Sequence, residues 1–229
     1  MATETTKPNI KHPHQRVGVF IDVQNMYYSA KALYNRKVNF GEILKTAVAD
    51  RQLIRALAYV VRATGEEGAF FEALNQRGIE TKERELQEFH SGVKKADWDV
   101  GITVDAIRIG EILDVVVLVS GDGDFVELVE YLKHHGKQVE VVAFRKSTSS
   151  RLVAAADAFV DLDSDPKYLI GSAGHSINHS ISDRTETKDR LESSGDSFWI
   201  KPPQKNTPRP PTRTSTTKNT RKPIKRTKK

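Results

Sequence analysis

The stretch VGVFID, residues 17–22, is an apolar run of strand length that ends in an acid. It opens a series in which such runs alternate with segments of helical period, a pattern typical of a mostly parallel sheet with helices on both faces. We therefore predict an α/β fold with a five-stranded sheet. The expected strands are rich in Val, Ile or Ala, as doubly covered strands are. They span residues 17–21, 56–61, 80–84, 115–119 and 139–143, and residues 159–162 are a candidate for a short edge strand.

The segments between these runs have the period of amphipathic helices. The expected helices cover residues 25–34, 41–50, 67–76, 97–110, 124–134 and 149–156. In a parallel α/β sheet, ligands bind beyond the carboxyl ends of the strands, at the point where the strand order reverses. Polar residues that directly follow a strand are therefore the first place to look for a functional site.

Charge divides the chain into two parts. Residues 1–163 carry 21 Lys and Arg against 24 Asp and Glu, whereas residues 164–229 carry 15 against 6, so the net charge of +6 belongs to the C-terminal part. Residues 200–229 contain eleven Lys or Arg and no acid, which attracts a polyanion. We predict a disordered N-terminus over residues 1–15, one domain over 16–163, a polar linker over 164–199 and a disordered basic tail over 200–229.

Composition excludes several classes of site. The chain has no cysteine, so it forms neither a disulfide nor a thiolate zinc site, and its seven histidines lack metal-ligand spacing. The longest apolar run, residues 115–119, is far shorter than the roughly 18 residues that a membrane span needs. We expect a soluble, cytoplasmic protein without a membrane partner.

Acids follow two of the predicted strands and occupy one predicted helix. Asp22 ends the first strand, and Asp122 and Asp124 leave the fourth strand within SGDGDF, residues 120–125, where glycines allow a tight turn. Asp99 and Asp105 lie in the helix that begins near residue 97. An isolated Asp at such positions is usually a helix cap, and Asp105 is rotated by about 120° from Asp99 on an ideal helix, so one helix face does not present both.

Several carboxylates in one cleft raise each other's pKa unless a cation neutralises them. Oxygen ligands without cysteine or a histidine pair favour Mg²⁺ or Mn²⁺ over zinc. Such ions serve phosphate chemistry, because they neutralise a scissile phosphate and activate a bound water. The acids therefore predict a metal site with a role in phosphoryl chemistry.

Three motifs carry a resemblance to a known family. They are FIDVQN at residues 20–25, the pattern K-x-x-x-D-V-x-x-x-x-D-A at residues 95–106, and SGDGDF at residues 120–125. In this order and at these spacings, the chain resembles the NYN domain family in its LabA-like branch, part of the PIN-like nuclease superfamily. The resemblance covers about 145 residues, and it implies a Rossmann-like PIN/NYN fold with an acidic metal pocket at the strand ends.

The family resemblance also implies an activity, namely endonucleolytic cleavage of RNA by a water that Mg²⁺ or Mn²⁺ activates. By motif match, the metal and catalytic candidates are Asp22, Asp99, Asp122 and Asp124, and Asp105 is a further metal candidate. The substrate-binding candidates are Asn25, Ser120, Lys95, Arg145 and Lys146, the last two because they leave the fifth strand at the same sheet edge as Asp22.

Other functions remain as alternatives. The main one is a non-catalytic module of the same fold that binds RNA or a protein, and a homodimer and a protein partner for the apolar Phe198-Trp199 segment also stay open. A receiver domain needs adjacent acids after the first strand, and a dehalogenase-type phosphatase needs D-x-D there. Residues 22–24 supply neither pattern, and no G-x-G-x-x-G follows the strand, which excludes a dinucleotide site.

Overall fold

The computed structural model describes residues 11–62, 68–85, 87–88, 94–95 and 97–171. Its main sheet has six parallel strands in the order β4-β3-β1-β7-β8-β9. These are β1 (Arg16–Asp22), β3 (Gln52–Arg62), β4 (Glu80–Glu85), β7 (Val115–Val119), β8 (Gln138–Ala143) and β9 (Ala158–Asp161). Strand β1 lies between β3 and β7, so the strand order reverses at its carboxyl end.

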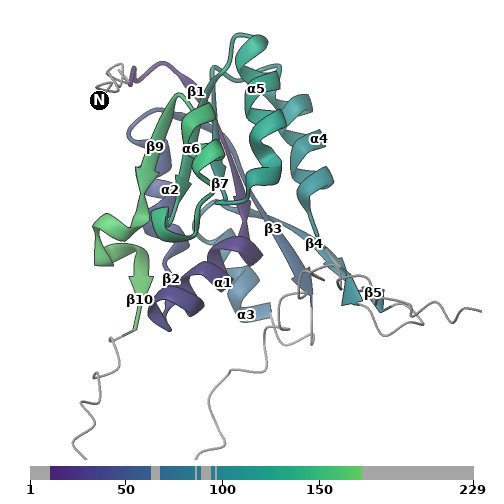
Figure 1. Cartoon of the computed structure of the whole chain (residues 1–229), viewed down its shortest axis with the longest axis vertical. Helices are drawn as coiled ribbons and strands as arrows, with labels where there is room; N and C mark the ends of the chain where they lie inside the picture. The colour runs from purple at the N-terminus through teal and green to yellow at the C-terminus, as the bar shows by residue number, and fades with distance from the viewer. Residues whose placement is uncertain (1–10, 63–67, 86, 89–93, 96, 172–229) are drawn as a thin grey trace, which may run out of the picture.

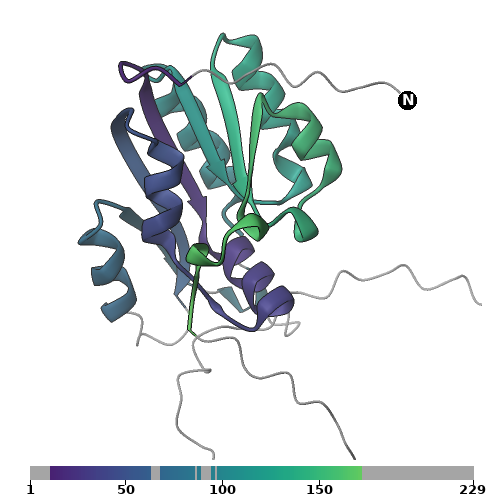
Figure 2. The same ribbon diagram turned by 90° about the vertical axis from the view of Figure 1, so that its left-hand side faces the viewer.

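Six helices cover the two faces of this sheet (Figures 1 and 2). On one face lie α1 (Val23–Tyr34), α2 (Phe40–Val48) and α3 (Gly68–Asn75). On the other lie α4 (Asp99–Gly110), α5 (Val126–His134) and α6 (Ser150–Ala155). Short 3₁₀ turns η1 (Gly123–Phe125), η2 (Arg145–Ser147), η3 (Leu162–Ser164) and η4 (Pro166–Tyr168) join some of them.

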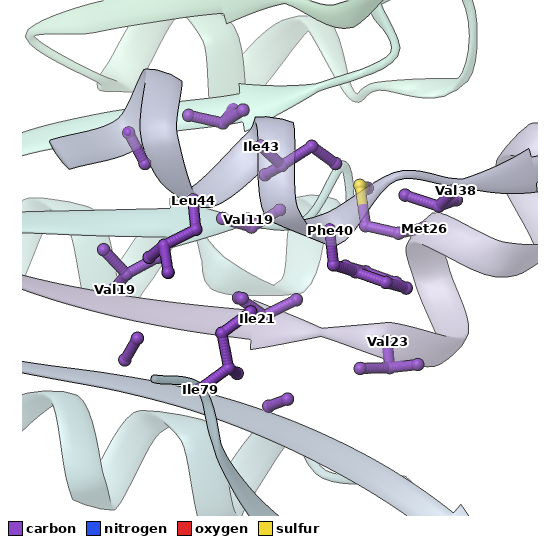
Figure 3. Packing of buried hydrophobic residues seen from close by; sticks show 14 of the residues in the cluster. Val19, Ile21, Val23, Met26, Val38, Phe40, Ile43, Leu44, Ile79 and Val119 are labelled. Atoms are coloured by element: carbon purple, nitrogen blue, oxygen red, sulfur yellow. The ribbon is translucent and has the colours of Figure 1, made fainter. Parts of the chain in front are cut away.

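Each face of the sheet has its own hydrophobic core, because neighbouring residues of a strand point to opposite faces. Val19 and Ile21 of β1 point toward α1 and α2, where Met26 and Ile43 are fully buried (Figure 3). Phe20 points to the other face, toward α4 and α5. This alternation also places Asp22 on the same face as Phe20.

The fold class is the predicted one, and every predicted strand and helix is present with ends shifted by a few residues. The sheet has six strands rather than five, because the candidate edge strand forms as β9 and pairs with β8. Two-residue strands were not predicted, since a strand this short leaves no periodic signal in the sequence. They are β2 (Lys37–Val38), β5 (Gln87–Glu88), β6 (Lys94–Lys95) and β10 (Leu169–Ile170).

The packed part of the chain extends beyond residue 163 and includes the first residues of the predicted polar linker, which was expected to begin at residue 164. Tyr168 is buried, its carbonyl accepts a hydrogen bond from the N–H of Asn39 (2.8 Å), and β10 pairs with β2. The predicted tail, most of the linker, the Phe198-Trp199 segment and residues 1–10 lie outside the described residues. No helix among the described residues is long and apolar enough to cross a membrane.

Candidate functional site

The site lies at the carboxyl ends of β1 and β7, where the strand order reverses. Asp22 is the last residue of β1 and Ser120 directly follows β7, and both side chains are buried. The Ser120 hydroxyl donates to Asp22 Oδ2 at 3.3 Å. Parallel pairing of the two strands therefore brings residues 98 positions apart into direct contact.

Asp22 is also the N-cap of α1. Its Oδ1 accepts a hydrogen bond from the N–H of Asn25 at 3.0 Å, which satisfies one of the free amides at the start of the helix. The capping role considered from the sequence is thus present. It does not exclude a ligand role. Oδ1 accepts from Asn25 and Oδ2 accepts from Ser120, and each carboxylate oxygen has a second lone pair.

The Asp22 carboxylate is in an unfavourable environment for a charge. Burial raises its pKa to about 7, and the charges of Asp99 and Asp122 act in the same direction. The N–H of Asn25 and the Ser120 hydroxyl oppose this shift. The three acids that the sequence placed on β1, on α4 and after β7 are therefore electrostatically coupled in the folded chain.

The loop after β7 is held by side chains from the site. The N–H of Gly121 donates to Asn25 Oδ1 at 2.9 Å, and the N–H of Asp122 donates to the Ser120 hydroxyl oxygen at 3.2 Å. Asp122 in turn caps η1, because its Oδ1 accepts from the N–H of Asp124 at 3.1 Å. Asp124 is exposed at the rim of this loop.

The glycines of this loop, expected from the sequence to allow a tight turn, also allow a close approach by the segment after β8. A Cβ on Gly121 would lie 2.9 Å from Thr148 Oγ1 and 3.2 Å from Thr148 Cα, and one on Gly123 would lie 2.8 Å from Ser149 Oγ. The N–H of Ser149 also donates to the Gly121 carbonyl at 3.0 Å. The segment after β8 therefore packs directly on the acidic loop.

Asp99 is the first residue of α4 and is half-buried. This position favours an anion, because the free N–H groups and the dipole of a helix N-terminus attract negative charge. Trp98 precedes it as the N-cap residue, and the Trp98 side chain makes no capping hydrogen bond. Asp99 thus enters the site from the helix that covers one face of β1 and β7.

Comparisons with known proteins agree with this arrangement. The model of the NYN domain family matches residues 16–163, which include every element described at the site. The chain belongs to the NYN domain family. This family is part of the PIN-like nuclease superfamily. The chain is 27% identical over 164 residues to the low amplitude and bright protein LabA of Synechococcus elongatus, and the match covers 65% of this chain and 84% of that protein.

A solved structure resembles this NYN domain as well. It is the crystal structure of a protein of unknown function from Vibrio parahaemolyticus, with 32% sequence identity and a TM-score of 0.64. The likeness covers 70% of this chain and 99% of that one.

In the NYN domain, Asp105 is paired with groups of β3 and β4. Its Oδ2 accepts from Lys82 Nζ at 2.6 Å and from the Tyr59 hydroxyl at 2.9 Å, so it is already neutralised. The rotation expected between Asp99 and Asp105 means that the two acids leave α4 in different directions. The structure thus gives Asp105 a role in fixing α4 to β3 and β4, and a metal role stays a prediction.

The two basic candidates after β8 are held through their backbone by acids of the following segment. The backbone N–H groups of Arg145 and Lys146 donate to the carboxylates of Asp161 (3.3 Å) and Asp163 (3.0 Å). Lys146 Nζ donates to the Tyr34 hydroxyl at 3.3 Å, and the Arg145 guanidinium lies over the Phe159 ring. Both side chains remain exposed, so a phosphate contact stays a prediction, as it does for Lys95, whose side chain is outside the described part.

The donor set fits a hydrated magnesium ion better than a closed metal cage. Among the described residues, no group of three or more His, Asp or Glu is arranged to hold a metal ion. Asp22, Asp99 and Asp122 are nevertheless electrostatically coupled carboxylates, one of them buried, and their oxygens are of the type that Mg²⁺ prefers. Mg²⁺ keeps several waters and is typically bound by one or two carboxylates together with substrate phosphate, so this partial set suits it.

The residues that support the acids were not predicted from the sequence. Trp98 lies within the second motif and contacts the strand beside it, and Thr148 and Ser149 pack against the glycines of the third motif. The two glycines were a usable signal, since a glycine between two acids indicates that another backbone passes close by. The Trp98 contacts depend on pairing between β3 and β4, which the sequence does not reveal.

Proposed function

We propose that this chain is a metal-dependent endoribonuclease whose site is built from Asp22, Asp99 and Asp122. The observation that carries the proposal is the buried Asp22 carboxylate, whose pKa is raised by burial and by the two other acids at the switch point of the sheet. Such an arrangement is destabilised until a cation joins it. Membership of the NYN family, within a nuclease superfamily, supports RNA as the substrate.

We assign different roles to the residues of the site: metal binding, positioning and proton acceptance. Asp22, Asp99 and Asp122 would hold Mg²⁺ or Mn²⁺, which when bound neutralises the scissile phosphate and acidifies a water. Ser120 and Asn25 keep Asp22 and the loop after β7 in place through their hydrogen bonds. The exposed Asp124 is our candidate for accepting a proton from the attacking water, because its carboxylate is open to solvent next to Asp122.

The folded part and the tail would bind RNA by different means. Residues 1–163 have a small excess of acids, so this part repels RNA until a divalent ion bridges carboxylate and phosphate. Of three cations near the strand ends, Lys82 pairs with Asp105, the Lys146 charge interacts with Asp163, and the Arg145 guanidinium lies over the Phe159 ring. The eleven cations of residues 200–229 are then the main source of attraction, without choosing a sequence.

The test is incubation of the purified protein with labelled single-stranded and structured RNA in Mg²⁺, Mn²⁺ or EDTA. We expect cleavage that needs the metal and falls by about 100-fold or more in Asp22→Asn, Asp99→Asn and Asp122→Asn. Asp114→Asn is the matched control, because Asp114 pairs with Arg16 at the amino end of the sheet. Equal activity of Asp22→Asn and wild type would remove Asp22 from the site.

A second candidate function is a non-catalytic module of the same fold that binds RNA or a protein. The absence of a preassembled group of three ligands among the described residues favours it. RNA binding with no cleavage in any metal, and no effect of the three Asp→Asn changes on that binding, would establish this alternative.

A further inference from the structure

Trp98 connects the first turn of α4 to the strand next to the site. Its indole Nε1 donates to the carbonyl of Val60 on β3 at 2.9 Å, and its ring lies against the Tyr59 ring, with the centroids 5.4 Å apart. Strand β3 pairs with β1 so that Tyr59 is in register with Asp22. The residue before Asp99 is therefore fixed to the strand position beside Asp22.

The start of α4 is shaped around this ring. A Cβ on Gly101 would lie 2.5 Å from Trp98 Cε3 and 3.0 Å from Cζ3, so only glycine leaves room for the indole against the first turn. The N–H of Ile102 donates to the Trp98 carbonyl at 2.7 Å, which makes Trp98 the first acceptor of the helix. The Trp98 side chain does not cap the helix by a hydrogen bond, and its indole instead packs against the first turn of α4.

Arg84 also contacts the indole. Its guanidinium carbon lies 4.4 Å from the centroid of the Trp98 ring, and its NH1 donates to the carbonyl of Asp97 at 2.8 Å. Arg84 comes from β4, whose register pairs it with Val61 of β3. Residues of β3 and β4 therefore contact Asp97 and Trp98, the two residues that immediately precede Asp99.

We propose that Trp98 and Arg84 are positioning residues that hold the Asp99 carboxylate toward Asp22 and thereby set the affinity of the site for a divalent cation. The inference rests on the proposed metal site and goes beyond it by naming the supports of its helical ligand. Asp99 follows Trp98 directly, so a shift of the indole moves the carboxylate with it. Outer contacts of this kind typically change metal affinity by about 10- to 100-fold when they are removed.

Two other roles make different predictions. If the Arg84 and Trp98 contacts serve stability alone, their loss lowers the melting temperature without changing the metal concentration that the folded protein needs. If Arg84 binds RNA phosphate, its loss raises the KM for RNA without changing metal binding. Positioning of Asp99 predicts weaker metal binding and a lower kcat, with the KM for RNA unchanged at saturating metal.

Trp98 supplies its own spectroscopic signal. The chain has two tryptophans, so Trp199→Phe in the full-length chain leaves Trp98 as the single indole. Mn²⁺ quenches nearby indole fluorescence, and titration of this variant with Mn²⁺ reports binding next to Asp99. Asp99→Asn in the same background shows whether the response belongs to this site.

The decisive comparison adds Arg84→Ala, Arg84→Lys and Arg62→Ala to the Trp199→Phe background. Arg62 is the matched control, because this arginine of the neighbouring strand β3 also lies over an aromatic ring, that of Phe71 on α3, and pairs with Glu83. We expect Arg84→Ala to weaken Mn²⁺ binding by about 10-fold, Arg84→Lys to weaken it less, and Arg62→Ala to leave it unchanged. Trp98→Phe, which keeps a ring but loses the Nε1 donor, is followed by the Mg²⁺ dependence of cleavage.

The outcomes separate this inference from the proposed function. An Mn²⁺ response that Arg84→Ala weakens, in a protein that cuts no RNA, would support the positioning role and overturn the nuclease proposal. Metal-dependent cleavage with equal Mn²⁺ affinity in Arg84→Ala and its background would overturn the positioning role alone. No Mn²⁺ response of Trp98 at all would overturn the positioning role, and lack of cleavage in the same preparation would overturn both.

Discussion

The backbone N–H of Gly121 donates to the Asn25 side-chain oxygen at 2.9 Å, and this bond joins the first turn of α1 to the loop after β7. Asn25 also donates its own backbone N–H to Asp22. One residue therefore contacts both the first acid of the site and the loop that carries the second. The asparagine in the first motif is explained by this double contact.

Replacing Asn25 by Ala should loosen that connection. The N–H of the buried Gly121 would lose its acceptor, which costs about 1–3 kcal/mol of stability. Cleavage should fall by about 10-fold or more, because the Asp122 loop is no longer fixed to α1. Urea unfolding and RNA cleavage measure the two effects, with Gln24→Ala as the neighbouring control. An Asn25→Ala protein with normal stability and activity would contradict the structural assignment.

The buried Asp22 should make the metal-free protein less stable as the pH rises. Its pKa is about 7 in the folded chain against an ordinary 3.8, so between these values the folded state keeps a proton that the unfolded state has lost. Stability is unaffected below about pH 4, falls as the pH rises to about 7, and stays reduced above it. The full effect is roughly 2–4 kcal/mol.

Asp22→Asn removes this penalty, because a neutral amide still accepts from the N–H of Asn25. In EDTA, the difference in melting temperature should shift in favour of the variant between about pH 4 and pH 8. Added Mg²⁺ should stabilise the wild type and not the variant. A variant that is much less stable than wild type at every pH would show that capping of α1 is the main role of Asp22.

Asp105 should behave as a structural acid. Asp105→Ala leaves the buried Tyr59 hydroxyl without its acceptor and should cost about 1–3 kcal/mol, while the double variant with Tyr59→Phe should recover part of that loss. The Mg²⁺ concentration that supports cleavage should stay the same in the single variant. A clear rise in that concentration would instead return Asp105 to the set of metal ligands.

The sequence predicts the central strands of this fold well because they are buried on both faces of the sheet. The run at residues 115–119 is entirely apolar, and the structure gives it the same ends. Acids at strand exits follow the same logic, since the carboxyl ends of parallel strands share one edge. The contacts among Asp22, Ser120 and the loop after β7 lie where those motifs predict.

Interactions between side chains that are far apart in the sequence were beyond this reasoning. Arg51 and Glu140 form a buried ion pair at 2.8 Å, 89 positions apart, and nothing in either local pattern marks them. Asp105 matches a family motif as well as Asp99 does, yet Asp105 forms an ion pair with Lys82 of β4. Periodicity predicts which face of an element a residue occupies, but it does not predict which side chain the residue contacts there.

The position at which the chain is shortened should matter. A protein that ends at residue 165 loses Tyr168, which is buried and whose hydroxyl lies 3.2 Å from Thr46 Oγ1, together with the β10 pairing to β2. We expect it to be about 3 kcal/mol less stable than a protein that ends at residue 171. Tyr168→Ala in the full chain should reproduce most of the loss, whereas Lys167→Ala, an exposed neighbour, should not.

The basic tail should account for most of the salt dependence of RNA binding. Deletion of residues 201–229 removes all eleven cations counted in residues 200–229, and each lost phosphate contact flattens the slope of log K against log salt by about 0.7 to 0.9. Cleavage at saturating RNA should be unchanged, because every proposed catalytic acid lies in residues 22–124. Binding curves at several salt concentrations, with Ca²⁺ in place of Mg²⁺ to limit cleavage, give both slopes.

The double variant Arg145→Ala, Lys146→Ala is the comparison for that deletion. These two cations already interact with Phe159 and Tyr34, so we expect a smaller change in slope than the tail deletion gives. A double variant that flattens the slope as much as the deletion would place the RNA on the loop after β8. Unchanged slopes in the deletion would leave the tail without a role in RNA binding, because counterion release is the only term through which eleven exposed cations would act.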